Sequence, residues 1–272
     1  MTTITLNNGV TMPQLGFGVF QVSTQDTEDA VAEALRVGYR SIDTAAIYGN
    51  EEPVGRAVAA SGVPREDLFV TTKLWNTDQG YDEALRAFDT SLGKLGLERL
   101  DLYLIHWPAA ARDRYVESWR ALGKLLADGR VRAIGVSNFQ VPHLERVIEE
   151  TGTVPAVNQI ELHPRLQQEE LRRFHAGHGI ATEAWSPLAQ GGDLLRDEVI
   201  TAIADEHGRT PAQVVLRWHL QLGNVVIPKS VTPSRIAENF AVTDFELGRA
   251  DLDRIATLET GERVGPHPDE FA

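Results

Sequence analysis

Short, mostly apolar segments recur along the chain and alternate with longer stretches in which apolar and polar residues mix. Each short segment has the length and apolar character of a buried β-strand. We place eight such strands at 15–20, 41–45, 68–74, 101–106, 133–138, 156–162, 181–187 and 224–230. Ahead of them, residues 3–12 alternate around Asn8-Gly9, which predicts a β-hairpin.

The longer stretches carry the period of amphipathic helices. In the stretch 115–129, apolar residues recur on one stripe, and Gly129 follows as a C-cap signal. The stripe consists of Val116, Trp119, Leu122 and Leu126. Further along, Thr210 predicts a helix N-cap and Pro211 the first helical residue. Helical stretches therefore separate the predicted strands.

Strands that alternate with helices form right-handed βαβ units and a parallel sheet. Eight of them, with no linker or low-complexity segment between them, predict one α/β domain over 1–272, a single (β/α)8 TIM barrel with an N-terminal β-hairpin. The rival is a doubly wound sheet, but "LGFGVF" at 15–20 does not fit the G-x-G-x-x-G that usually follows its first strand. The interval before the eighth strand is the longest and leaves room for an additional helix.

Composition narrows the classes of function. The 272 residues are 42% hydrophobic and 24% charged, as in an ordinary globular protein. The formal net charge of -13 disfavours a nucleic-acid partner, because such proteins usually present a basic face. The absence of cysteine excludes disulfides and thiolate metal sites. The first residues lack a signal-peptide pattern and no apolar run is long enough to span a bilayer, so we expect a cytoplasmic protein without a membrane partner.

Polar or amphipathic side chains close nearly every predicted strand, and a barrel enzyme places its chemistry at these carboxyl ends. In chain order they are Asp43, Lys73, His106, Ser137, Asn138, Gln159, Glu161, Trp185, Ser186, Lys229 and Ser230. Tyr48 lies in the loop after the second strand. Taken singly, each side chain also has a structural interpretation, such as a satisfied core histidine or a solvated lysine. Four titratable side chains that converge on one barrel mouth indicate a catalytic site.

The four titratable side chains suit carbonyl reduction. Hydride addition to a carbonyl leaves an alkoxide that an acid must protonate, and the phenol of Tyr48 serves if its pKa, normally about 10, is lowered toward the working pH. The ammonium of Lys73 favours the phenolate, and Asp43 holds the lysine and stays ionised. His106 can donate a hydrogen bond to the carbonyl oxygen and orient the substrate. None of these steps needs a metal.

Residues 225–240 supply a candidate site for a hydride-donating cofactor. Thr232 predicts an N-cap, so Lys229, Ser230 and Arg235 surround a helix N-terminus, which is a ready anion site. An arginine beside a lysine suits a dianionic ribose phosphate and favours NADPH over NADH. The structural alternative is a basic rim that holds no ligand.

Neighbouring strand ends complete this candidate cofactor site. Trp185 offers a flat face for a nicotinamide ring, although a tryptophan buried in the core would give the same pattern. Ser137, Asn138 and Gln159 offer hydrogen bonds that match the nicotinamide amide.

Eight motifs in register resemble the aldo-keto reductase superfamily. They are "LGFGVF", "SIDTAAIYGNEEPVG", "TTKLWN", "LDLYLIHWP", "IGVSNF", "NQIELHP", "WSPLAQGG" and "IPKSVTPSRIAENF". The pattern is most similar to the bacterial branch that includes 2,5-diketo-D-gluconate reductases. The resemblance covers essentially the whole chain and implies a monomeric barrel that binds extended NADPH and reduces aldehydes and ketones.

The resemblance also implies site residues. It makes Asp43, Tyr48, Lys73 and His106 a catalytic tetrad, with Tyr48 as the proton donor. The implied cofactor contacts are Gly18, Val19, Phe20, Asp43, Ser137, Asn138, Gln159, Trp185, Ser186, Leu188, Gln190, Lys229, Ser230, Val231, Thr232, Arg235, Glu238 and Asn239. The implied substrate contacts are Phe20, Tyr48, Trp75, His106 and Trp107, and no metal ligand is implied.

Several positions depart from the pattern of the family. Val19, Trp185 and Gln190 stand where many relatives have threonine, tyrosine and serine. The loop after Trp107 and the C-terminal tail are short, and both segments shape substrate pockets in this family. We therefore expect an open mouth with aromatic walls that accepts small ketones, dicarbonyls and keto-sugars broadly.

Three other functions stay open at this point. A Schiff-base aldolase would need an uncharged Lys73, which the neighbouring Asp43 disfavours. A metal-dependent hydrolase would draw on His106, Glu161 and His163, but no H-x-H pair ends an early strand. A nucleotide-sensing subunit on the same fold would bind NADPH with negligible turnover, which an intact tetrad disfavours.

Overall fold

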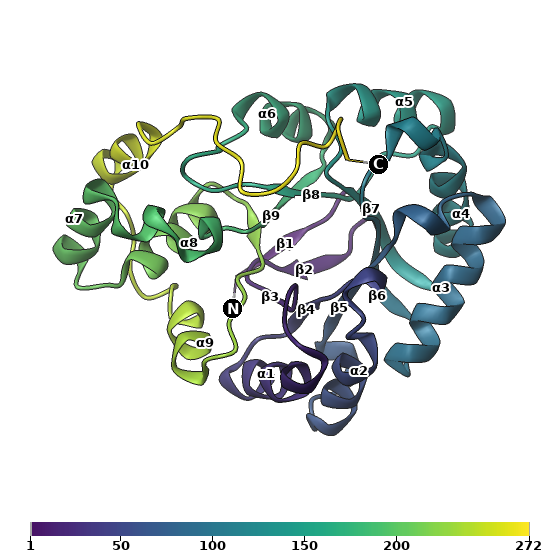
Figure 1. Ribbon diagram of the computed structural model, residues 1–272, viewed down its shortest axis with the longest axis horizontal. Coiled ribbons are helices and arrows are strands. Elements are labelled where there is room, and N and C mark those ends of the chain that lie inside the picture. The colour runs from purple at the N-terminus through teal and green to yellow at the C-terminus, as the bar shows by residue number, and fades with distance from the viewer. Residues whose placement is uncertain (1, 272) are drawn as a thin grey trace.

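A computed structural model describes residues 2–271, and within them eight parallel strands form one sheet in chain order (Figure 1). The strands are β3 (Phe17–Gly18), β4 (Ser41–Asp43), β5 (Phe69–Leu74), β6 (Leu100–Ile105), β7 (Val131–Ser137), β8 (Val157–Glu161), β9 (Ala181–Trp185) and β10 (Val225–Val226). The barrel closes where Leu15 pairs in parallel with Val226. The predicted (β/α)8 barrel is confirmed, and each of the eight predicted segments overlaps a strand, although β6 begins one residue and β7 two residues before the predicted start.

Helices surround the barrel (Figure 1). They are α1 (Thr24–Val37), α2 (Glu51–Ala60), α3 (Tyr81–Leu95), α4 (Tyr115–Ala127), α5 (Val141–Thr151), α6 (Glu169–His178), α7 (Glu198–His207), α8 (Pro211–Gln221), α9 (Pro233–Phe240) and α10 (Arg249–Ala256). Both α7 and α8 lie between β9 and β10, so the long interval holds the additional helix that its length predicts.

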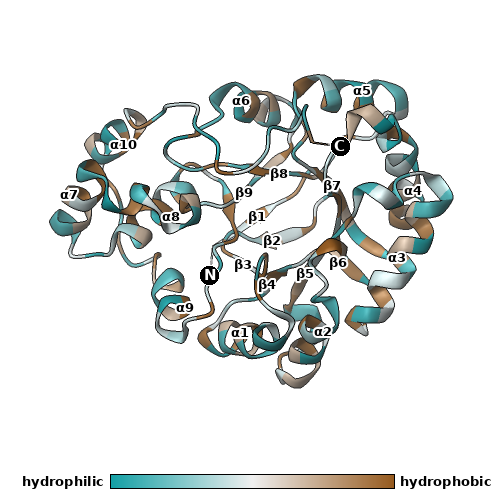
Figure 2. Cartoon of the chain, viewed as in Figure 1, coloured by the Kyte–Doolittle hydropathy of each residue, from teal (hydrophilic) through white to brown (hydrophobic). Residues whose placement is uncertain are grey.

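The helices form where the apolar period and the caps predict them. In α4, Val116, Trp119 and Leu122 are buried, while Leu125 continues the buried stripe in place of Leu126, which is half-buried. The N-cap hydroxyl of Thr210 accepts a hydrogen bond from the backbone of the third residue of α8, as its sequence predicts. Figure 2 shows the resulting pattern, with hydrophobic colour concentrated on the strands and hydrophilic colour on the outer faces of the helices.

An antiparallel hairpin of β1 (Thr3–Thr5) and β2 (Thr11–Pro13) precedes the barrel, as predicted. Gly9 adopts a φ of 84° in its turn, a conformation that favours glycine. Leu6 and Met12 pack in one buried cluster with strand residues such as Leu102 and Val157. The hairpin thus covers one end of the barrel interior, and the carboxyl ends of the strands lie at the other end. Within residues 2–271, no helix is both long and apolar enough to cross a membrane.

A buried carboxylate ties the amino-terminal end of the barrel together. Asp101 on β6 is 1% exposed and accepts hydrogen bonds from the Arg65 guanidinium at 2.6 Å, the Arg132 guanidinium at 2.9 Å and the backbone N–H of Val70 at 2.9 Å. Asp101→Ala leaves these donors without their acceptor, so we expect the free energy of unfolding to fall by about 2–4 kcal/mol. Denaturant titration measures the change.

Asp89→Ala is the matched control, because it removes an aspartate that pairs with Arg130 while 60% of its side chain is exposed. Such exposed pairs contribute less than about 1 kcal/mol. Equal losses in the two variants would show that the buried position of Asp101 does not matter.

Candidate active site

Asp43 and Lys73 form a buried ion pair at the carboxyl ends of β4 and β5. The Lys73 Nζ donates to Oδ1 of Asp43 at 2.6 Å and to the carbonyl oxygen of Thr44 at 2.9 Å. Neither charged side chain is more than 3% exposed. Burial alone would lower the pKa of Lys73, but Asp43 and Tyr48 raise it further than burial lowers it. Lys73 therefore stays an ammonium, which argues against the Schiff-base aldolase.

Tyr48 ends the short 3-10 helix η1 (Ala46–Tyr48) after β4, so its ring returns over the barrel mouth. The Lys73 Nζ lies 5.2 Å from the centroid of the ring, and the ring of His106 lies 5.5 Å away from it. Burial raises the pKa of Tyr48 to about 12, although the ammonium of Lys73 pulls it down. The expected lowering of this pKa is therefore wrong for the structure, because loss of hydration outweighs the lysine.

His106 follows β6 directly and is 7% exposed. Burial, with the Lys73 ammonium as a second cause, holds the pKa of His106 well below its usual range. The imidazole is therefore neutral at neutral pH. Its Nδ1 has no hydrogen-bond partner among residues 2–271, and its backbone carbonyl accepts from the Asn138 amide at 3.0 Å.

Aromatic side chains wall the mouth beside His106. Trp75 lies 5.2 Å from the His106 ring between centroids, and Phe20, which is 50% exposed, lies 5.0 Å from the ring of Tyr48. The ring of Phe271 lies 4.6 Å from Trp107 and 6.1 Å from Trp75. The short tail thus covers part of the mouth that we expected to be open. The sequence gives no periodic signal that would have placed Phe271 there.

The residues proposed to face a nicotinamide lie together at the ends of β7, β8 and β9. The hydroxyl of Ser137 donates to the backbone oxygen of Gln159 at 2.8 Å and accepts from the Asn138 amide at 3.1 Å. The indole N–H of Trp185 donates to Oδ1 of Asn138 at 2.8 Å. Trp185 is only partly buried, so it lies at the mouth and is not a core tryptophan.

Some of the strained backbone positions of the described residues follow β7 and β9. Asn138, Ser186 and Gln190 have φ of 64°, 47° and 58°, in the left-handed region that non-glycine residues rarely adopt. Such conformations cost about 1–3 kcal/mol each and cluster at binding sites, where the surrounding structure holds them. A cradle built in this way fits a bound cofactor.

The predicted anion site forms at the start of α9. Lys229 and Arg235 are exposed, Ser230 is 9% exposed, and the Ser230 hydroxyl accepts from the backbone N–H of Thr232 at 3.1 Å. Thr232 is the N-cap residue, but its own hydroxyl makes no capping bond. Because the side chains of Lys229 and Arg235 are exposed, they can meet an anion from solvent.

Other predicted cofactor contacts lie in or after β3, after β9, and beside or on α9. A Cβ on Gly18 would approach the Ile227 carbonyl oxygen to 3.0 Å, so glycine allows β3 to lie close to the segment after β10. Val19 is buried, Leu188 is partly exposed and Val231 is 51% exposed. At the far end of α9, Asn239 is 5% exposed and the Glu238 carboxylate accepts from the Thr210 hydroxyl at 2.9 Å.

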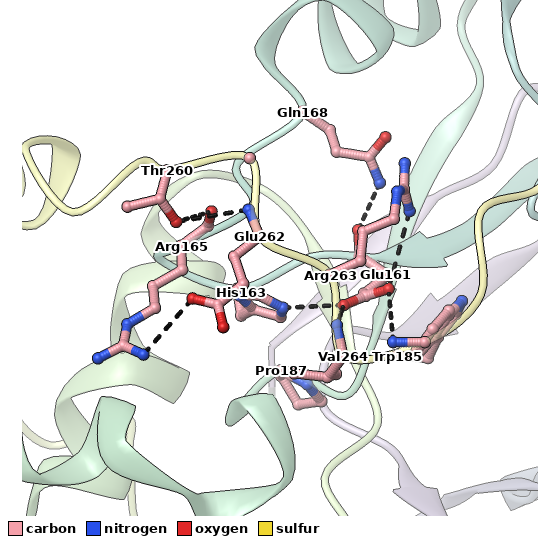
Figure 3. A network of polar contacts seen from close by, with 12 residues as sticks. Glu161, His163, Arg165, Gln168, Trp185, Pro187, Thr260, Glu262, Arg263 and Val264 are labelled. Atoms are coloured by element: carbon pink, nitrogen blue, oxygen red, sulfur yellow. Dashed lines mark hydrogen bonds and ion pairs between the residues drawn. The ribbon is translucent and has the colours of Figure 1, made fainter.

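Glu161 and His163 belong to a network of polar contacts that holds the C-terminal tail (Figure 3). The buried carboxylate of Glu161 accepts from His163 Nε2 at 3.0 Å and from the backbone N–H groups of Val264 and Gly265. Arg263 pairs with the same carboxylate at 3.7 Å. Within residues 2–271, no group of three or more His, Asp and Glu side chains is arranged to hold a metal ion.

Comparison with known proteins places the chain in a family. The model of the Aldo/keto reductase family matches residues 14–260. An aldo-keto reductase of Mycolicibacterium smegmatis is 63% identical and covers 98% of this chain and 97% of its own length. The methylglyoxal reductase DkgA of Salmonella typhimurium is 56% identical and covers 99% and 98%.

Solved structures agree with this assignment. An aldo/keto reductase of Brucella melitensis superposes with a TM-score of 0.92 at 57% identity, over 95% of this chain and 99% of its own. A variant of Gox0644 in complex with NADPH superposes with a TM-score of 0.95 at 51% identity, over 99% of this chain and 98% of its own. The chain therefore belongs to the aldo/keto reductase family and is an NADP(H)-dependent oxidoreductase that reduces small-molecule carbonyl compounds.

Proposed function

We propose that this enzyme reduces small aldehydes, ketones, dicarbonyls and keto-sugars with NADPH, and that Tyr48 donates the proton. The observation that carries the proposal is the convergence of Tyr48 and His106 on the buried Lys73–Asp43 pair. A protonated phenol, a neutral imidazole and a fixed ammonium are what an alkoxide-forming reduction requires.

The protonation states of the two candidate acids support Tyr48. With its pKa at about 12, the phenol keeps its proton throughout the neutral range, so it has a proton to donate. Because the pKa of His106 lies well below its usual range, its imidazole carries no acidic proton beyond that of the neutral ring. The neutral N–H suits a hydrogen bond to the carbonyl oxygen, which orients the substrate toward the phenol.

Lys73 supplies the charge that makes the transfer efficient. Its ammonium lies near the phenol and stabilises the phenolate that remains after the proton leaves. Asp43 keeps the ammonium in place through the 2.6 Å contact. The aromatic wall of Trp75, Trp107 and Phe271 limits the access of water and strengthens these electrostatic interactions.

The strand-end cradle and the α9 cations fit NADPH, which supplies the hydride when it is bound. We propose that Trp185, Ser137 and Gln159 face the nicotinamide, because they lie beside the strained segments at Asn138 and Ser186. We propose that the remaining residues implied by the motifs also contact the cofactor. The helix N-terminus beside Ser230 suits the ribose phosphate.

Arg235→Ala tests this assignment of the phosphate. One charge-assisted contact is worth about 1.5–3 kcal/mol, so we expect NADPH to bind roughly tenfold to hundredfold more weakly. NADH, which lacks the ribose phosphate, should lose little, and the preference for NADPH should narrow. Quenching of tryptophan fluorescence gives both dissociation constants.

Arg249→Ala is the control for general loss of positive charge, since Arg249 is an exposed arginine on α10 that pairs with Asp253. It should leave both dissociation constants unchanged. Equal weakening of NADPH and NADH by Arg235→Ala would mean that Arg235 does not contact the phosphate.

Substrate breadth is tested with a panel of keto-sugars, small dicarbonyls and aromatic aldehydes, followed by NADPH absorbance. Among relatives, DkgA is named a methylglyoxal reductase, which supports small dicarbonyls. We expect broad acceptance, with Michaelis constants on the order of the upper end of the usual range, near 1 mM. One substrate turned over far faster than all its analogues would contradict this breadth.

Tight NADPH binding with negligible turnover across the whole panel would instead favour a nucleotide-sensing subunit. We also propose that residues 1–272 act as one domain and as a monomer, because the described part of one chain contributes every residue of the proposed site. Light scattering after size-exclusion chromatography tests the monomer.

A further inference from the structure

Glu183 is a buried acid that the proposed chemistry leaves unused. It lies on β9, two residues before Trp185, and its exposed fraction is 0%. Its Oε1 has no hydrogen-bond partner among residues 2–271. Glutamate is almost never fully buried unless it is paired, so the complete burial of Glu183 needs an explanation.

Gln159 connects Glu183 to the catalytic ion pair. The Gln159 amide nitrogen donates to Oδ2 of Asp43 and to Oε2 of Glu183, both at 2.9 Å. Since β8 and β4 are separated by three strands in either direction around the closed sheet, this bridge crosses the barrel interior. Asp43 also accepts from Lys73, so the four side chains form one continuous buried chain.

The bridge fixes the orientation of the Gln159 amide. The carboxylate of Asp43 only accepts hydrogen bonds, so the amide nitrogen of Gln159 faces it, and the second N–H of the same nitrogen donates to Oε2 of Glu183. Both of its N–H groups are then used, and its oxygen points away from the two acids. Without Glu183, the Gln159 amide loses one of its two acceptors, and the bridge to Asp43 becomes less rigid.

The charge of Glu183 affects the ionisable groups that lie near it. Lys73 and Asp43 balance each other, so an ionised Glu183 would add an uncompensated negative charge. The ionisable groups that face it are Asp43 from β4, Lys73 from β5 and Tyr48 from η1. Its direct neighbours in the sheet, Gln159 on β8 and Val225 on β10, carry no charge.

We propose that Glu183 is a positioning residue of the active site: it anchors the Gln159 bridge, and its charge controls how firmly Tyr48 holds its proton. This inference rests on the proposed role of Tyr48 as the proton donor. Burial, followed by the repulsion of Asp43, raises the pKa of Glu183 to about 8. The acid is thus neutral at neutral pH. Its ionisation at higher pH contributes to the raised pKa of Tyr48 and makes the phenol a weaker acid.

The pH profile of reduction tests the charge. With NADPH and methylglyoxal, we expect the wild-type kcat to fall by about threefold to tenfold as the pH rises through about 8, since one pKa unit in the acid changes proton transfer by at most about tenfold. Glu183→Gln keeps an acceptor for Gln159 but cannot ionise, so its kcat should not fall there. Glu51→Gln is the matched control, because Glu51 is also buried but bonds to Thr72 outside this chain of residues. The fall should persist in this control.

Glu183→Ala tests the anchor. It removes the acceptor as well as the charge, so we expect kcat at neutral pH to drop by about tenfold or more, as misplaced catalytic groups do. Glu183→Gln should stay near the wild-type rate at that pH. Equal rates in the alanine and glutamine variants would exclude the anchoring role.

Thermal unfolding provides a readout that does not depend on turnover. Because the pKa of Glu183 lies at about 8 in the folded chain and at 4.5 in a solvated side chain, the folded chain holds this proton more tightly. The wild type should therefore lose stability relative to Glu183→Gln as the pH rises from 4.5 through about 8.

The outcomes separate the two proposals. Suppose that the wild type reduces methylglyoxal, that the kcat of Glu183→Gln still falls as the pH rises through about 8, and that the stability difference between the two proteins does not change with pH. The inference on Glu183 is then overturned, and the proposed function stands. If the wild type reduces nothing, the proposed function fails, and a constant stability difference then overturns the charge of Glu183 as well.

Discussion

Tyr48→Phe is expected to lower kcat for carbonyl reduction by about 10²–10⁴-fold while the dissociation constant of NADPH stays near the wild-type value. The substitution removes only the hydroxyl, so the ring still packs 5.0 Å from Phe20 and 5.5 Å from His106. The imidazole of His106 does not replace the lost proton, because it is already neutral at neutral pH. Initial rates at saturating NADPH measure the loss.

Tyr81→Phe is the control for the loss of a tyrosine hydroxyl outside the proposed site. Tyr81 opens α3 and is 39% exposed, outside the proposed site, so its loss of a hydroxyl should leave kcat unchanged. A loss of less than about tenfold in Tyr48→Phe would be too small for the removal of a general acid.

Lys73→Met should damage both activity and stability. The substitution removes the partner of Asp43 at 2.6 Å and leaves a buried carboxylate without its counter-charge. Breaking such a pair costs about 3–5 kcal/mol of folding free energy. The phenolate also loses its stabilising charge, so we expect kcat to fall by about 10²-fold or more. Denaturant titration and initial rates measure the two effects.

A second variant separates the two effects of Lys73→Met. The pair Asp43→Asn and Lys73→Met removes both charges together, so most of the lost stability should return while the activity stays low. Recovery of activity along with stability would mean that Lys73 acts only by supporting the fold.

The barrel and the convergence of the four titratable side chains were predictable from the sequence for a physical reason. Strands buried on both faces read as apolar segments, and each ends where a polar residue emerges into the mouth. Asp43, Lys73 and His106 occupy these points, and the structure brings them together with Tyr48. The capped helices followed from local signals that need no tertiary contact, such as Thr210 before Pro211.

Strand lengths were less predictable. The first and last predicted strands span six and seven residues in the sequence, yet β3 and β10 contain two residues each. Closure of the barrel relies on the single bridge between Leu15 and Val226, and the flanking residues bond irregularly, as Gly18 does to the carbonyl oxygen of Pro228. Apolar character alone does not report where regular pairing stops.

Other features depend on contacts between distant segments. The pKa of Tyr48 is raised because the folded mouth excludes water from the phenol, and no local sequence pattern predicts this exclusion. Phe271 contacts Trp107, which is far from it in the sequence, and the tail that carries Phe271 has no apolar periodicity to predict this contact. Glu183 reads as one acid in an ordinary strand until Gln159 is seen to link it to Asp43 across the barrel.

The identity of the proton donor is tested most directly by single-turnover reduction of methylglyoxal in Tyr48→Phe and His106→Gln, with NADPH preloaded and its binding measured in each variant. We predict that Tyr48→Phe loses about 10²–10⁴-fold in the rate of the first turnover, with NADPH bound as in the wild type. His106→Gln should lose less, because glutamine can still donate a hydrogen bond to the carbonyl oxygen. An active Tyr48→Phe together with an inactive His106→Gln would contradict this assignment and make the imidazole the acid.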